Sequence, residues 1–152
     1  MSVNRNFVLC ALLLTLACSL SAQPRRGRAG AGGVAETTRI ISDCERRTNT
    51  FKKTLDRALG RDNVRLGQGR EDELNREASR LENQLDKAGD SWNRDHNPDS
   101  TRDHVRAAIA VGNDIDRAMR SNRMGPDAER EWAAVRAELN RLAQTFNLPR
   151  IR

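Results

Sequence analysis

The chain has 152 residues, with 27 Lys or Arg against 21 Asp or Glu, which gives a formal net charge of +6. Three of the arginines, Arg25, Arg26 and Arg28, lie in one Gly-rich stretch, so the rest of the chain is close to charge balance. Aromatic residues make up only 3% of the chain and Tyr is absent, which leaves no platform of stacking side chains. We therefore expect no nucleic-acid partner.

The first residues have the three parts of a secretory signal peptide. Arg5 supplies the positive charge, residues 7–20 form an apolar run, and the small residues Ser21 and Ala22 follow. We predict that 1–22 is a signal peptide cleaved near Ala22, and that the protein is secreted or periplasmic with no stable membrane anchor after cleavage. The alternative is an uncleaved anchor, although a membrane span needs a longer apolar run of about 20 residues.

Two of the three cysteines, Cys10 and Cys18, fall within the predicted signal peptide, so only Cys44 remains after cleavage. A single thiol forms no internal disulfide. Residues 15–18 resemble a bacterial lipoprotein box but lack the Leu expected three positions before the cysteine. Lipidation of Cys18 stays an open alternative.

Residues 23–33 are rich in Gly, Ala and Arg and predict a disordered linker. An apolar stripe with spacings of three and four then predicts a first helix that Gly60 ends. A Gly-containing loop over 61–69 leads to a second helix from near Arg70, whose stripe is thin and which Gly89 could end early. The first stripe is Val34, Thr37, Ile41, Cys44, Thr48, Phe51, Leu55 and Ala58, and the second is Leu74, Ala78, Leu81, Leu85, Ala88 and Trp92.

The stretch 97–100 breaks the chain again, and Asp99 or Ser100 is the predicted N-cap of a third helix. Pro126 stands where the first residue of a fourth helix is expected, and that helix ends at 147–149. The third stripe is Val105, Ala108, Ile109, Gly112, Ile115 and Met119, and the fourth is Ala128, Trp132, Val135, Leu139, Leu142 and Phe146. We expect the Trp132 side chain to lie in the core. Trp92 is close to a helix end, and we expect its side chain to lie nearer the surface.

Residues 55–59 match 115–119 in pattern, and each is followed by a Gly-bearing loop and an acidic helix start. This weak repeat favours two αα-hairpins that pack together, although any two amphipathic hairpins share such a likeness. The predicted fold class is all-α, a four-helix bundle built from two αα-hairpins over 34–148.

The only two histidines belong to a repeated tripeptide, Arg-Asp-His, which occurs at 94–96 and again at 102–104. Carboxylates and imidazoles suit a divalent metal, and the candidate ligands are Asp95, His96, Asp99, Asp103 and His104. Their spacing matches neither HExxH nor an EF-hand loop. We favour the alternative of a solvated loop between helices with an N-cap, and so predict no metal site.

Catalytic motifs are absent from the sequence. There is no GxSxG, and the glycines at 67–69 lack the Lys-Ser or Lys-Thr of a phosphate-binding loop. Cys44 lies on the apolar face of the first helix, where a cysteine is a buried and inert side chain. We expect no enzymatic activity, no catalytic residue and no cofactor.

The stretch from Arg47 to Phe146 contains the motifs RTNTF at 47–51, REDEL at 70–74 and LNRLA at 139–143, together with Trp132. Through these residues the stretch resembles small secreted helical bacterial proteins of uncharacterised function. The resemblance implies export and a helical bundle, and it implies no catalytic residues. The chain is also similar in size and charge to exported helical chaperones of the bacterial envelope, but their Leu-Thr-x-x-Gln signature is absent.

These observations predict a non-enzymatic interaction protein of the bacterial envelope or exterior. The thin stripe over 74–92 predicts that this helix completes its burial against a protein partner or a second copy of the chain. The alternatives are an envelope stress chaperone, and a ligand- or metal-binding module that uses the 92–104 loop.

Overall fold

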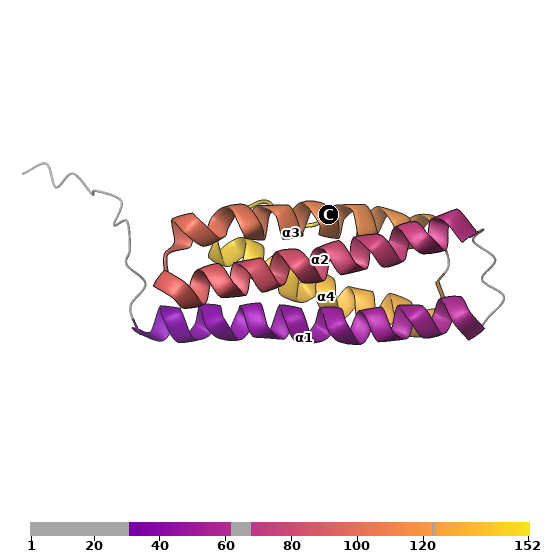
Figure 1. The fold of residues 1–152 in the computed structure, drawn as a ribbon, viewed down its shortest axis with the longest axis horizontal. Helices are drawn as coiled ribbons and strands as arrows, with labels where there is room; N and C mark the ends of the chain where they lie inside the picture. Colours follow the sequence, from indigo (N-terminus) through magenta and orange to yellow (C-terminus); the bar gives the residue numbers. More distant parts are fainter. Residues whose placement is uncertain (1–30, 62–67, 123) are drawn as a thin grey trace, which may run out of the picture.

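The computed structural model describes residues 31–61, 68–122 and 124–152. Within these ranges there is no strand, and the helices are α1 (Ala31–Arg61), α2 (Gln68–Asp95), α3 (Pro98–Ser121) and α4 (Pro126–Thr145). The four helices lie along one long axis and pack into a bundle (Figure 1). The predicted all-α four-helix bundle is therefore confirmed. The predicted signal peptide, 1–22, lies outside the described residues.

Each helix packs against two neighbours. Helices α2 and α4 both contact α1 and α3, whereas the diagonal pairs α1/α3 and α2/α4 make no close backbone contact. Consecutive helices run in opposite directions (Figure 1). Helices α3 and α4 share the fewest close contacts of the four neighbouring pairs, and we call their junction the α3–α4 seam. None of the helices in the described ranges is long and apolar enough to span a bilayer.

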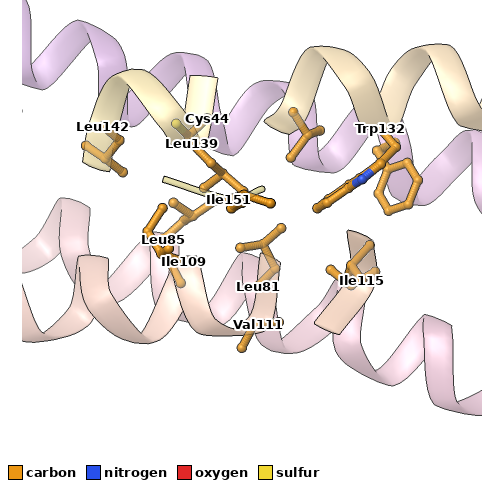
Figure 2. Packing of buried hydrophobic residues seen from close by; sticks show 14 of the residues in the cluster. Cys44, Leu81, Leu85, Ile109, Val111, Ile115, Trp132, Leu139, Leu142 and Ile151 are labelled. Carbon is orange, nitrogen blue, oxygen red and sulfur yellow. The ribbon is translucent and has the colours of Figure 1, made fainter. Parts of the chain in front are cut away.

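The apolar stripes meet in one core, part of which Figure 2 shows. The thin stripe of α2 is fully covered within the single chain, since its six residues are all buried: Leu74, Ala78, Leu81, Leu85, Ala88 and Trp92. A side chain already removed from water gains little from a further partner. The burial of α2 therefore gives no reason to expect self-association through this helix, and self-association itself stays a prediction.

Both tryptophans lie in this core. Trp132 is 4% exposed, as expected, and its ring centroid is 5.3 Å from that of Phe51. The expectation that Trp92 lies nearer the surface is wrong, because Trp92 is only 1% exposed. Its indole Nε1 donates a hydrogen bond of 3.0 Å to Thr38 Oγ1 on α1, which satisfies its polar atom inside the bundle.

The bounds of α1 and α2 differ from the predicted ones. Helix α1 begins at Ala31, inside the predicted linker 23–33, and continues through Gly60 to Arg61. Gly89 does not end α2, which continues to Asp95. A Cβ atom at Gly89 would lie 2.7 Å from Glu45 Oε1 of α1, so the missing side chain allows the two helices to approach closely.

The predicted N-cap of α3 is also corrected. Neither Asp99 nor Ser100 caps the helix, because Pro98 already occupies the first helical position, where its missing N–H costs no hydrogen bond. Asn97 is the N-cap instead, and its Oδ1 accepts from the backbone N–H of Asp99 at 3.0 Å. At α4 the prediction is confirmed, since Pro126 is the first helical residue.

The 147–152 segment turns back from the end of α4 and lies on the α3–α4 seam. Ile151 is 5% exposed, and Figure 2 shows it in the packed interior beside Leu139. A Cβ atom at Gly112 of α3 would lie 2.6 Å from Ile151 Cδ1, so the Ile151 side chain packs against α3 at this glycine. The packed region thus extends beyond residue 148, where the predicted domain 34–148 ends.

Candidate binding site on the α3–α4 seam

Two of the five residues considered as metal ligands, Asp95 and His96, lie at the connection between α2 and α3. Asp95 accepts from the backbone N–H of Asn97 at 3.0 Å and from the Ser100 hydroxyl at 3.2 Å. His96 is exposed and has a left-handed backbone with φ of 49°, and its ring centroid lies 5.7 Å from that of Trp92. A helix C-terminus commonly adopts this conformation.

The other three candidates, Asp99, Asp103 and His104, belong to α3. Asp103 forms an ion pair with Arg106 on its own helix. Across the part of the chain that the structure describes, no group of three or more His, Cys, Asp or Glu side chains is arranged to hold a metal ion. The structure does not bring the five candidates together around a common point.

Cys44 is fully buried and makes no disulfide. Burial raises the pKa of its thiol, and the negative charge of Glu138 raises it further. A thiolate is therefore strongly disfavoured at neutral pH, and only the thiolate is a good nucleophile. The prediction of a buried cysteine on the apolar face of the first helix is confirmed.

A buried carboxylate organises the α3–α4 seam. Asp116 of α3 is 4% exposed, and its Oδ1 accepts from Trp132 Nε1 at 2.9 Å and from Arg136 Nη1 at 3.0 Å, both of α4. Arg120, one helical turn along α3, forms an ion pair with its Oδ2. The buried charge is thus paired with two guanidinium groups and one indole N–H.

Two open pockets flank this carboxylate. The first has a volume of about 270 Å³ and is lined by Asp116, Met119, Arg120, Asn122, Glu129, Trp132, Ala133 and Arg136. The second, of about 480 Å³, is lined by Asn113, Asp116, Arg117, Arg120, Ser121 and Arg152. We call Arg117, Arg120, Arg136 and Arg152 the arginine cluster. Only two acidic residues, Asp116 and Glu129, line the same pockets, which leaves an excess of positive charge.

Sequence reasoning missed this site. Asp116 and Arg120 are four residues apart, and so are Trp132 and Arg136, which places each pair on one helix face. That spacing was readable from the sequence. The sequence does not show that the two faces meet across the seam. Asp116 stands next to an apolar stripe, at a position where an exposed side chain is expected.

A second charged group lies between α1 and α2. Burial, followed by the negative charges of Asp86 and Asp90, raises the pKa of Glu45. Burial and the charges of Glu82 and Asp90 also raise the pKa of Asp86, while Lys52 acts in the opposite direction. Asp86 is an exposed residue and Glu45 is half-buried, so we expect folding to change the pKa of Glu45 more than that of Asp86.

No family model, curated protein or solved structure matches this chain.

Proposed function

We propose that this chain is an exported, non-enzymatic interaction protein of the bacterial envelope or exterior that binds an acidic protein partner through the α3–α4 seam. The observation that carries the proposal is the convergence of Arg120 and Arg136 on the single buried carboxylate of Asp116, beside an open pocket. Export rests on the signal-like residues 1–22 and on the resemblance to secreted helical proteins.

The chemistry of the seam favours recognition of carboxylates. Each guanidinium group has five N–H donors, and Asp116 uses only some of them. The Arg120 and Arg136 side chains are 59% and 38% exposed, so their remaining donors are open to a ligand. Of the apolar residues that line the first pocket, Ala133 is exposed and offers a small surface against which the carbon atoms of an acidic side chain can pack.

Among residues 31–61, 68–122 and 124–152, no observation favours either alternative function. A chaperone needs exposed apolar surface in the folded state. The stripes of the four helices are largely buried, so we expect the native protein to bind little hydrophobic dye. A ligand module in the 92–104 loop would need the carboxylate of Asp95, which already accepts hydrogen bonds within the loop.

The test is the binding of a fluorescein-labelled hexaglutamate peptide, followed by fluorescence anisotropy at low ionic strength. Arg136→Gln is expected to weaken binding about tenfold, the equivalent of one charged hydrogen bond. Arg106→Gln removes the same charge from α3 outside both pockets and is expected to change affinity less than about twofold. An equal loss in both variants would mean that the peptide responds only to overall charge.

A further inference from the structure

The α3–α4 seam holds the 147–152 segment largely through its backbone. Asn140 Oδ1 accepts from the backbone N–H of Ile151 at 2.8 Å, and Asn140 Nδ2 donates to the carbonyl of the same residue at 3.4 Å. One side-chain amide thus pairs with both polar groups of one residue. This pairing does not depend on which side chain that residue carries.

Arginines of α3 bind two further carbonyl groups of the segment. Arg102 Nη2 donates to the carbonyl of Asn147 at 3.2 Å, and Arg120 donates to the carbonyl of Arg152. Arg120 is the same residue that pairs with Asp116, so the segment ends at the arginine cluster. Figure 1 marks the end of the chain over the middle of α3.

Ile151 is the most deeply buried side chain of the segment, and Leu148 is half-buried against the same core. Ile151 is buried, and the nearest atoms to a Cβ placed at Gly112 are Ile151 Cδ1 at 2.6 Å and Leu139 Cδ1 at 3.1 Å. Gly112 therefore provides the space for this anchor, whereas the neighbouring Arg150 and Arg152 are exposed. Main-chain hydrogen bonds with one side-chain pocket form the usual pattern of extended-peptide recognition.

We propose that the α3–α4 seam is a docking site for an extended peptide of a partner protein that carries one branched aliphatic side chain, and that the 147–152 segment occupies this site in cis. The inference rests on the proposed function and names the ligand class for the same seam. The aliphatic side chain takes the place of Ile151, and an acidic group of the partner takes the place of the Arg152 carbonyl at Arg120. The segment competes with the partner for the seam.

The test uses the full chain with Ile151→Ser, which leaves the anchor position open, and a fluorescein-labelled peptide, Leu-Pro-Arg-Ile-Arg. The variant is expected to bind the peptide at least about tenfold more tightly than the wild type, because a tethered segment competes at an effective concentration of about 1 mM. Replacing Ile by Asp in the peptide should abolish binding. Adding Gly112→Ala to the variant should also remove it, since the new methyl group occupies the anchor position.

Circular dichroism and cooperative unfolding establish that each variant is folded. If Ile151→Ser does not fold, Ile151→Val keeps an aliphatic anchor and should give a smaller gain of the same sign. Equal binding of the Ile and Asp peptides by a folded variant, or no binding at all, overturns the proposal. A wild-type dimer in light scattering that becomes monomeric in Ile151→Ser also overturns it, because a second copy would then supply the segment.

A third peptide, Leu-Pro-Arg-Ile-Glu, separates this inference from the proposed function when all of the peptides carry an amidated C-terminus, so that only the Glu side chain adds a carboxylate. If both hold, its added carboxylate at Arg120 tightens binding about tenfold relative to the Arg peptide. Equal affinity for the two peptides refutes the acidic-partner function and leaves the docking site supported. Binding of hexaglutamate without binding of either Ile peptide refutes the docking site alone.

Discussion

Two glycines buried in the middle of helices give a test of the seam, because replacing each with Ala should change stability in opposite directions. Ala in a helix interior is favoured over Gly by about 1 kcal/mol. At Gly89 the new Cβ would meet only the terminal Oε1 of Glu45, a flexible and half-buried side chain that can turn toward water. We therefore expect Gly89→Ala to stabilise the protein by up to about 1 kcal/mol.

At Gly112 the new Cβ would meet Ile151 and Leu139, both buried, at 2.6 and 3.1 Å. Overpacking of this kind costs about 1–3 kcal/mol, which exceeds the gain in helix propensity. Gly112→Ala should therefore destabilise the protein by about 1 kcal/mol. The free energy of unfolding is measured by urea titration of the helical circular-dichroism signal. A Gly112→Ala variant as stable as Gly89→Ala would refute the placement of Ile151 against α3.

Three further results are expected. Asp116→Asn should lower the free energy of unfolding by about 2 kcal/mol, because it weakens three charged contacts. The control Asp114→Asn loses one exposed ion pair and should lower it by less than about 0.5 kcal/mol. Similar losses in urea titrations of the two variants would contradict the role given to Asp116. The raised pKa of Glu45 means that the folded state binds the Glu45 proton more tightly than the unfolded state does, so this stabilisation is complete below the ordinary value of 4.5 and is lost as pH rises through the folded pKa. Glu45→Gln should therefore flatten the pH dependence of the urea midpoint in that range. An unchanged curve would assign the pH dependence to other groups such as Asp86. Cys44 should react with iodoacetamide only at the rate of unfolding, as followed by mass spectrometry of its peptide, and fast labelling of the native protein would rule out its full burial.

The helices were predictable because each carries an apolar stripe with helical spacing, and even the thin stripe of α2 was sufficient. Its burial was not predictable, because spacing within one helix does not say how many neighbours cover it. The cap at Asn97 was missed because Asp, Ser and Asn are all good caps, and only the position of Pro98 separates them.

The seam was beyond sequence reasoning for a different reason. Asp116 acquires its role from Trp132 and Arg136, which lie sixteen and twenty residues further along the chain on another helix. Ile151 follows Pro149 with no periodic neighbours, so no pattern marks it as a core residue. Both features depend on contacts between elements, and these become visible only when the helices are placed in space.

The pairing of α1 with α4 also has a consequence for the folding kinetics. Arg141 Nη2 lies 3.2 Å from Glu36 Oε1, and these residues are 105 positions apart. Hairpins close short loops first, whereas joining the first helix to the last requires a much larger loss of chain entropy. We expect the α1–α4 contacts to form after the folding transition state, so Arg141→Ala should accelerate unfolding and leave the folding rate nearly unchanged in a chevron plot.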